Sequence, residues 1–518
     1  MDAWQYFCDH HFTYRSVGLS LDVSKLAHFD ETSKKIDRES VFKEMSFLES
    51  GGIANPDENR MVGHYWLRNP AIAPTPELKN AITEVWDSID RFVYAIHSGD
   101  ITGETHAFKN LLCIGIGGSA LGPQLACAAL SPQKPKLAVY FLDNTDPEGI
   151  DTVLAQLEGQ LDATLVIVTS KSGGTPETRN GMLEVAHAYQ NAGLSFARHA
   201  VAITCTDSKL DQQARKEGWL KRFPMWDWVG GRTSIASVVG LLPMALCGIN
   251  YKTFLNGMRD MDSLTRRHEP NNPALLLATA WYTATDGKGT KDMVILPYKD
   301  RLSLFSRFLQ QLIMESLGKK LDRDNQPVYQ GITVYGNKGS TDQHAYVQQL
   351  RDGLSNFFVT FIEVLTDRDN ESVMIDDHTT TGDYLEGFFL GTRQALHEAD
   401  RSSVTLTIDR IDTYHLGVLI ALYERTVSFY ATMVHINAYH QPGVEAGKKA
   451  ANTILQLQAT ALEHLKSHPQ PQTVLEIAAS IRTQDFETLF KLLEHLSTNR
   501  RLQRTEADDP HQNRYLWR

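Results

Sequence analysis

Short apolar runs alternate with longer amphipathic stretches along much of this chain. Between residues 105 and 210 the runs are Leu111–Ile114, Val139–Leu142, Leu165–Val168 and Ala200–Ile203, each followed by a helical pattern. Strands that are apolar throughout and separated by helices are typical of a parallel sheet with both faces covered. The pattern therefore predicts a first α/β unit in this part of the chain.

The alternation resumes beyond a helical stretch and predicts a second sheet. Its strands are expected at Met293–Leu296, Gly331–Val334, Asn356–Leu365 and Val404–Ile408. A long helical region should follow from about Gly417 to Leu465, and the polar residues from about Arg500 should form an extended tail. The simplest architecture is an α/β protein with two doubly wound parallel-sheet domains, extra helices and a C-terminal helical tail.

The same pattern suggests where the domains begin and end. Residues 1–104 should form an N-terminal, largely helical part that packs with the second domain, and residues 105–248 the first α/β domain. Residues 249–447 should form the second α/β domain, and residues 448–518 the C-terminal helices and tail. In such sheets ligands bind at the carboxyl ends of the strands, where the Gly-rich loops of this chain lie.

Composition narrows the class of protein. The chain has 518 residues, of which 42% are hydrophobic and 22% charged, as is usual for globular proteins. Its net charge of -11 argues against general nucleic-acid binding. The longest apolar region, Ile235–Cys247, is too short to span a bilayer and no signal peptide is evident. Five cysteines without CxxC spacing suit a reduced cytosol, so we expect a cytoplasmic protein without a membrane partner.

The segment from Ser170 to Thr178 has the features of a phosphate-binding loop. It follows an apolar strand, contains two glycines, and leads into a helix for which Thr175 suits the cap and Pro176 the first position. Free N–H groups at a helix start attract anions. The candidate ligands are the hydroxyls and one lysine of this loop: Ser170, Lys171, Ser172, Thr175 and Thr178. The alternative is a well-capped helix with a solvated loop.

An earlier loop allows two different functions. Gly115-x-Gly117-x-x-Ala120 matches a dinucleotide fingerprint, and Asp143 ends the next strand where a ribose-binding acid would lie. That match would indicate a nicotinamide-dependent oxidoreductase. The spacing is a weak signal by itself, and Gly118 and Ser119 also suit a backbone cradle for a sugar phosphate.

The remaining candidate residues lie far apart in the sequence. Arg232 follows two glycines, which leave its guanidinium room to meet an oxyanion, although a turn with a structural arginine is an equal alternative. Phe305–Lys319 is predicted as an amphipathic helix that places Gln311 and Glu315 beside an apolar stripe. Desolvation there would raise the pKa of the carboxyl, as a general base needs, yet most such glutamates only edge a helix face.

His344 follows a strand and a Gly-containing loop. Asp342 could cap the next helix, which would place His344 in its first turn. A lone histidine is usually structural or solvated, but a loop position favours function. Further on, a helix should start after Pro442-Gly443, where Glu445 and Lys449 could form an exposed salt bridge.

Taken together, these motifs resemble the glucose-6-phosphate isomerase family, whose members carry two sugar-isomerase domains. The matching segments occur in the family's order and are Gly115–Gly122, Ser170–Thr178, Val229–Ser234, Met314–Ser316, Gln343–Ala345 and Gly443–Lys448. The chain departs from the common pattern at Ala120, at Thr233 and in the run Tyr439–Pro442. These departures bear on the loops that hold the substrate and leave the reaction class unchanged.

The resemblance implies a role for each candidate residue in an aldose-ketose isomerisation of glucose 6-phosphate and fructose 6-phosphate, in glycolysis and gluconeogenesis. Glu315 would move a proton between C2 and C1, and Arg232 would oppose the charge of the enediolate. His344 and Lys448 would open the sugar ring, with Glu177 orienting the imidazole. The substrate-binding set implied is Gly118, Ser119, Ser170, Lys171, Ser172, Thr175, Thr178, Gln311 and Gln441.

The same resemblance implies a homodimer in which His344 reaches the site of the neighbouring subunit. No metal or organic cofactor is expected, because the chemistry needs none and metal-ligand spacings are missing from the sequence. Two alternatives stay open at this point: an oxidoreductase that uses the Gly115 loop, and a non-catalytic sugar-phosphate-binding regulator. The joint presence of Glu315, His344 and Lys448 favours catalysis over the regulator.

Overall fold

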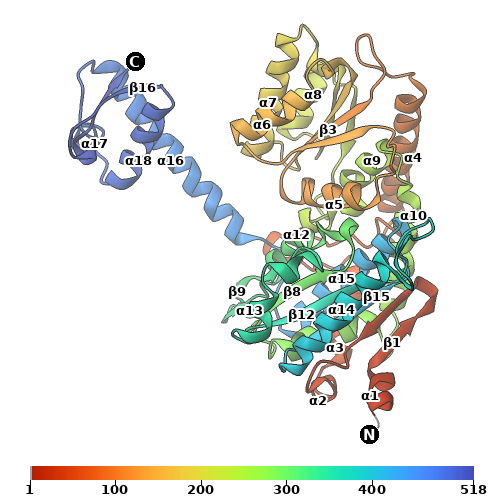
Figure 1. The fold of residues 1–518 in the computed structure, drawn as a ribbon. Coiled ribbons are helices and arrows are strands. Elements are labelled where there is room, and N and C mark those ends of the chain that lie inside the picture. The colour runs from red at the N-terminus through yellow and green to blue at the C-terminus, as the bar shows by residue number, and fades with distance from the viewer. Residues whose placement is uncertain (1–2) are drawn as a thin grey trace. The chain divides into compact units, whose positions relative to one another are not determined.

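The computed structural model describes residues 3–518, apart from the side chains of residues 444–446 and 448. Contacts divide the chain into two compact units, Met1–His440 and Gln441–Arg518, and each is described by itself (Figure 1). The larger unit contains both sheets. The four-part division at residues 104, 248 and 447 stays a prediction.

The first sheet is parallel throughout and has the strand order β4-β3-β5-β6-β7. Alternate side chains of its central strands point to opposite faces, where α6, α7 and α8 cover one face and α4, α5 and α9 the other (Figure 1). The four strands predicted here are confirmed. The elements are β3 (Asn110–Ile114), β4 (Ala138–Leu142), β5 (Thr164–Thr169), β6 (Ala200–Thr204), β7 (Lys221–Pro224), α4 (Pro76–Ser98), α5 (Leu121–Leu130), α6 (Pro147–Gln156), α7 (Pro176–Asn191), α8 (Lys209–Glu217) and α9 (Val238–Leu246).

The second sheet has the strand order β1-β2-β15-β12-β8-β11. Four of its strands are parallel, while a hairpin from the N-terminal region adds β2 antiparallel to β15 and β1 antiparallel to β2. The predicted fold class, α/β with two parallel sheets and C-terminal helices, is confirmed. The strands are β1 (His11–Tyr14), β2 (Leu19–Asp22), β8 (Asp292–Pro297), β11 (Val334–Tyr335), β12 (Phe357–Val364) and β15 (Ser403–Ile408).

Helices cover both faces of this second sheet as well. α13 (Val347–Asp352) and α14 (Thr381–Glu398) pack on one face, and α10 (Tyr251–Thr265), α11 (Pro273–Ala284) and α15 (Thr413–Met433) on the other. α15 is buried over most of its length. It packs very closely against α10 at Gly417. A Cβ placed on Gly417 would lie 2.2 Å from the carbonyl oxygen of Phe254, so only glycine fits there.

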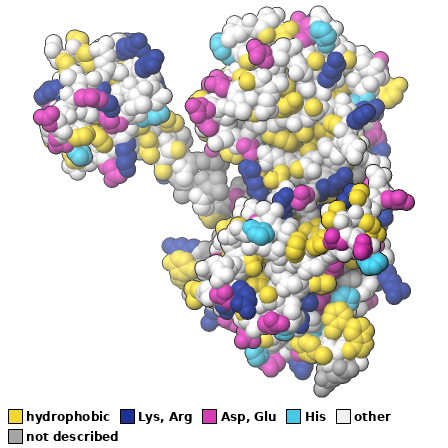
Figure 2. Space-filling view, viewed as in Figure 1, with side chains coloured by type: hydrophobic (Ala, Val, Ile, Leu, Met, Phe, Trp, Pro, Cys, Tyr) yellow, Lys and Arg dark blue, Asp and Glu magenta, His cyan; other side chains and the backbone are white. Residues whose placement is uncertain are grey.

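Smaller elements complete the larger unit. They are α1 (Ala3–His10), α2 (Phe29–Ser33), α3 (Arg38–Glu49), α12 (Phe305–Leu309), β9 (Lys319–Leu321), β10 (Pro327–Gln330), β13 (Met374–Asp376) and β14 (Thr379–Thr380). The N-terminal region is therefore mixed, with strands as well as helices. Acidic and basic side chains are interspersed over the face of the molecule that Figure 2 shows.

The C-terminal residues fold into a unit with its own core. α16 (Pro442–Ser467), α17 (Val474–Ile481) and α18 (Phe486–Thr498) enclose apolar side chains. The expected extended tail is wrong: β16 (Leu502–Thr505) and β17 (Arg514–Trp517) pair as an antiparallel hairpin, and Tyr515 is buried against the helices. The expected helical region from about Gly417 to Leu465 is present as two helices, because α15 ends at Met433 and α16 starts at Pro442, where proline favours a new helix. Of the helices described, none is long and apolar enough to cross a bilayer.

Candidate functional site

Two Gly-rich loops lie next to each other at the point in the first sheet where the strand order changes direction, between β3 and β5. β3 and β5 are neighbours in the sheet, and the loops after them carry Gly117–Ser119 and Ser170–Thr175. Such a switch point is where open α/β sheets bind ligands. The fold therefore brings both Gly-rich loops of the sequence to one edge.

The Ser170 loop is shaped by its own hydroxyls. The Ser170 hydroxyl accepts a hydrogen bond from Gly173 N at 3.1 Å and donates one to the Thr175 hydroxyl at 3.3 Å. Thr175 lies at the N-cap of α7 and Pro176 at its first position, as predicted, yet the Thr175 side chain accepts no hydrogen bond from the described helix. The first-turn amides are thus open to an anion. Thr178 is buried, and its hydroxyl has no partner among the residues described.

Lys171 ties the Ser170 loop to the turn that precedes Arg232. Its Nζ donates to the carbonyl oxygens of Asp227 and Val229, both at 3.0 Å. Burial lowers the pKa of this lysine, with a smaller effect from the Arg60 charge. The side chain therefore holds two parts of the site together.

The Arg232 turn packs directly on the Gly117 loop. A Cβ on Gly118 would lie 1.9 Å from the carbonyl oxygen of Gly231, so the two backbones touch. The hydroxyl of Ser234 donates to the carbonyl oxygen of Gly118 at 3.1 Å. Glycine at position 118 is required by this contact.

Arg232 and Glu315 form the charged centre of the site. Arg232 Nε lies 3.1 Å from Glu315 Oε2, and the two side chains are 7% and 20% exposed. Arg232 Nη1 also donates to the carbonyl oxygen of Ala438 at 2.6 Å. A carboxylate is therefore held against a guanidinium with limited access to water, which strengthens the electrostatic interaction between them.

The helix that carries Glu315 differs from the predicted one. The α-helix α12 ends at Leu309, a π-helical turn covers Gln310–Glu315, and Lys319 already starts β9. The predicted helix over Phe305–Lys319 is therefore present as far as Leu317, but it contains a π-helical turn and ends before Lys319. Insertions of π-helix often accompany functional sites, and this one carries both Gln311 and Glu315.

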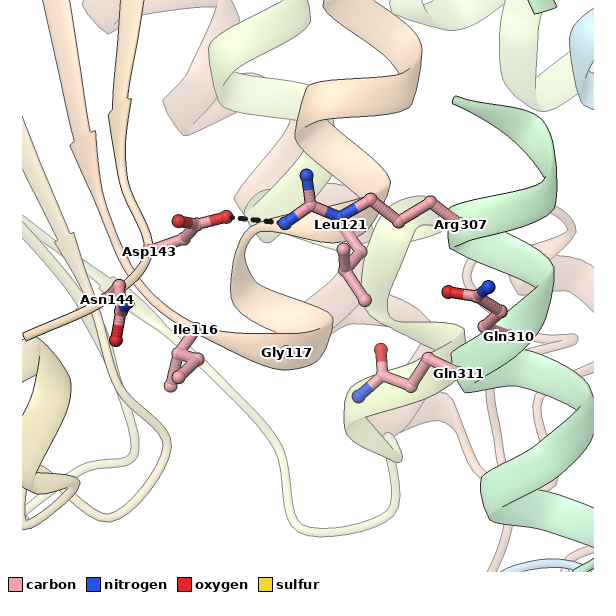
Figure 3. Close-up of a pocket in the computed structure, with 8 residues that line it drawn as sticks. All are labelled: Ile116, Gly117, Leu121, Asp143, Asn144, Arg307, Gln310 and Gln311. Carbon is pink, nitrogen blue, oxygen red and sulfur yellow. Dashed lines mark hydrogen bonds and ion pairs between the residues drawn. The ribbon is translucent and has the colours of Figure 1, made fainter. Parts of the chain in front are cut away.

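A pocket of about 370 Å³ opens beside Gln311 (Figure 3). It is lined by Ile116, Gly117, Leu121, Asp143, Asn144, Arg307, Gln310 and Gln311. Asp143, the candidate ribose acid of the oxidoreductase alternative, forms an ion pair with Arg307 at 3.2 Å and accepts from Gln124 at 2.8 Å. The Asp143 carboxylate is therefore already engaged by Arg307 and Gln124.

The amino-acid sequence was compared with protein-family models and with known proteins. The family model described as "Phosphoglucose isomerase" matches residues 21–473. A glucose-6-phosphate isomerase of Trichormus variabilis is 55% identical over 97% of this chain and 96% of its own length, and one of Geotalea daltonii is 54% identical over 96% and 95%. The chain belongs to the phosphoglucose isomerase family. The predicted family and enzyme class, an aldose-ketose isomerase, are confirmed, and the oxidoreductase and regulator alternatives find no support.

Solved structures place the chain in the same fold. The crystal structure of a glucose-6-phosphate isomerase from Chlamydia trachomatis has a TM-score of 0.78 and 26% identity, over 88% of this chain and 91% of the other. That of a hypothetical protein from Thermus thermophilus has a TM-score of 0.71 and 27% identity, over 84% and 99%.

His344 lies outside the centre formed by Arg232 and Glu315. It ends a short 3-10 helix, Thr341–His344, and its side chain is exposed. The expectation that Asp342 caps a helix is wrong: its carboxylate accepts from the backbone N–H groups of Asn337 and Lys338, and from the Tyr346 hydroxyl. Asp342 therefore fixes the loop that presents His344.

The other predicted residues are described to different extents. Glu177 lies half-buried in the first turn of α7, and among the described residues no hydrogen bond or ion pair joins it to His344. Ser119 and Ser172 lie on the two loops. Gln441 belongs to the smaller unit, and the side chain of Lys448 lies outside the described residues. No group of three potential metal ligands occurs among the residues described.

Sequence analysis missed Lys319, a buried lysine next to the charged centre. Its Nζ donates to the carbonyl oxygens of Glu315 at 2.7 Å and His440 at 3.1 Å. Burial, followed by the charge of Arg232, lowers the pKa of Lys319 to about 7. A pair of lysines in a polar stretch predicts exposure, so the sequence offered no signal for this contact.

Proposed function

We propose that this chain interconverts glucose 6-phosphate and fructose 6-phosphate by opening the sugar ring and moving a proton through a cis-enediol(ate). The observation that carries the proposal is the Arg232–Glu315 pair, placed beside two Gly-rich loops at the switch point of the first sheet. The reaction would serve glycolysis and gluconeogenesis.

Glu315 acts as the base that takes the proton from C2 and returns it to C1. A single carboxylate can do both, because the two carbons are adjacent and the enediol is planar. Arg232, now 3.1 Å from the carboxylate, opposes the negative charge that develops on the enediolate oxygens. Gln311 comes from the same π-helical turn and lies at the pocket, where it can hydrogen-bond the sugar.

The phosphate of the substrate binds in the Ser170 loop. The hydroxyls of Ser170, Ser172 and Thr175 and the first-turn amides of α7 are donors that suit a phosphate. Gly118 and Ser119 border the sugar from the neighbouring loop. Lys171 contributes positive charge from the side of the Arg232 turn.

We infer that His344 and Lys448 open the ring with Glu177 orienting the imidazole, that Gln441 binds the substrate, and that the protein is a homodimer with shared active sites. The support for the dimer is the environment of His344. The neighbouring Gln343 donates to the carbonyl oxygen of Phe388 on α14, and the Phe388 and Tyr384 side chains are 47% and 44% exposed. Exposed aromatic side chains around a predicted site residue are typical of a surface that a second copy covers.

We place the protein in the cytoplasm, where its five free cysteines stay reduced. A coupled assay tests the proposed function: the purified chain is given fructose 6-phosphate, and glucose 6-phosphate is measured through a dehydrogenase. Conversion is the expected result, with no metal added and with nucleotide present only as the acceptor of the coupling dehydrogenase. Absence of conversion by folded protein would refute the proposal.

A further inference from the structure

The fold treats two adjacent lysines on β9 very differently. Lys319 is only 4% exposed, whereas the side chain of Lys320 is exposed. Burying an ammonium group costs free energy that an apolar side chain would not cost, unless its contacts offset the loss of water. Lys319 lies four residues after Glu315, and the contacts of its ammonium group show what offsets the cost of burying it.

Those contacts join the base to the end of the larger unit. Lys319 Nζ donates to the carbonyl oxygen of Glu315 itself at 2.7 Å and to that of His440 at 3.1 Å. Arg232, the partner of the Glu315 carboxylate, donates to Ala438 in the same segment. Two buried cations therefore hold the segment Ala438–His440 against both members of the charged centre.

That segment is itself firmly placed. The Asn437 side-chain amide donates to Asn55 at 3.0 Å and to Asp57 at 2.6 Å, and the hydroxyl of Tyr439 donates to Ser428 at 3.0 Å. Lys319 joins the backbone of Glu315 to this segment by hydrogen bonds, so the segment helps to fix the position of Glu315.

We propose that Lys319 is a positioning residue for Glu315, and that its two hydrogen bonds fix the end of the π-helical turn to His440. The inference rests on the proposed role of Glu315 as the base. Single π-helical turns are frequent at functional sites, and a clamp at the last residue of this turn holds Glu315 in place.

Several charged and titratable groups surround Lys319. Arg232, Glu315 and Asp57 lie near enough to affect its titration, and His440 has its own pKa lowered by burial and by the Lys319 charge. Among the described residues no carboxylate forms a close ion pair with Nζ, so its two carbonyl contacts hold the side chain in place.

Four variants separate hydrogen bonding, charge and folding. Lys319→Met removes both the donors and the charge, Lys319→Gln keeps two N–H donors without charge, and Lys319→Arg keeps both. Lys320→Met is the matched control on the exposed neighbour. We expect kcat to fall about 10- to 100-fold in Lys319→Met, as misplacement of a reacting group does, with KM changed less than about threefold. Lys319→Gln should lie between, and Lys319→Arg and Lys320→Met near the unaltered chain.

Rescue by the conservative variant gives a readout that a merely structural role would not move. Positioning by hydrogen bonds predicts that kcat recovers in the order Lys319→Met, Lys319→Gln, Lys319→Arg, while the melting temperatures of the three variants do not follow that order. If Lys319→Met does not fold, the Gln and Arg variants still make the comparison.

Two results would overturn the inference. One is a loss of kcat in Lys319→Met and Lys319→Gln no greater than in Lys320→Met. The other is a loss that appears only as a raised KM. If the unaltered chain itself shows no isomerase activity, or Glu315→Gln keeps full activity, it is the proposed function that fails.

Discussion

Glu315 and His344 are both predicted to move protons, yet the chain surrounds them very differently. Glu315 is paired with Arg232, and its backbone is held by Lys319. His344 stands exposed at the end of a short 3-10 helix whose loop is fixed by Asp342. The contacts of Glu315 all come from its own chain, whereas His344 is exposed on a loop that Asp342 holds in place.

The difference suggests a division of labour. Proton transfer through the enediolate needs an electrostatic environment prepared in advance, and the buried Arg232 provides one. Ring opening needs an acid and base that reach the sugar from the other side, which an exposed residue on a firm loop can do from a second copy of the chain. The predictions below test this comparison.

Glu315→Gln should cause the largest loss. The amide keeps the shape of the side chain but cannot accept the C2 proton, so kcat should fall at least ~10²-fold while KM stays near its value. Steady-state kinetics on fructose 6-phosphate measure both. Near-normal turnover would remove Glu315 from the base role.

His344→Ala should impair turnover of the cyclic sugar, by about 10²-fold, far more than that of the open-chain form. Only the cyclic form needs the ring-opening step. Pre-steady-state kinetics with a defined anomer, compared with a substrate that cannot close a ring, separate the two. An equal loss on both would argue against the assignment, and Glu177→Gln should give a milder version of the same defect.

Thr175→Val should weaken binding of the substrate and of simple sugar phosphates alike, by about 10-fold or more, since a hydrogen bond to a charged group contributes about 1.5–3 kcal/mol. The effect should be the same for the cyclic and open forms of the sugar, because the Ser170 loop binds the phosphate and takes no part in ring opening. Calorimetry measures the affinity, with the melting temperature as a check on folding. Unchanged affinity with lower kcat would make the loop catalytic instead.

Mixing Glu315→Gln subunits with His344→Ala subunits should restore activity to within about twofold of the unaltered dimer in each mixed dimer. A shared site predicts this, because one of its two sites then combines the intact Glu315 of one chain with the intact His344 of the other. Mass spectrometry confirms the exchange of subunits. No recovery after exchange would show that each site is formed within one chain and would end the comparison drawn above.

The sequence predicted the parallel strands well. The run Thr164–Thr169 is entirely buried, and a strand buried on both faces must be apolar, so its pattern is legible. The start of α7 was predicted to the residue, because Pro176 favours the first helical position, although the Thr175 side chain makes no cap hydrogen bond. The capping role of Asp342 was wrong, since its carboxylate found backbone partners in the preceding loop instead.

The C-terminal hairpin was missed because only its packing makes it stable. Leu502–Thr505 is polar apart from one residue, and the pairing with Arg514–Trp517 is fixed by burial of Tyr515 against the helices. The π-helical turn was missed for a similar reason. A helical period predicts an α-helix, and the insertion depends on how Gln310–Glu315 packs against the surrounding elements.

By itself, then, the sequence determined the fold class, the two Gly-rich loops and the family, because these depend on local patterns of apolar residues, glycines and caps. Tertiary structure alone decided that Arg232 meets Glu315 across 83 positions of sequence, that Lys319 is buried and Lys320 is not, and that Lys171 binds the Arg232 turn. Such contacts join distant segments whose approach is set by the packing of two sheets, and no local pattern records that approach.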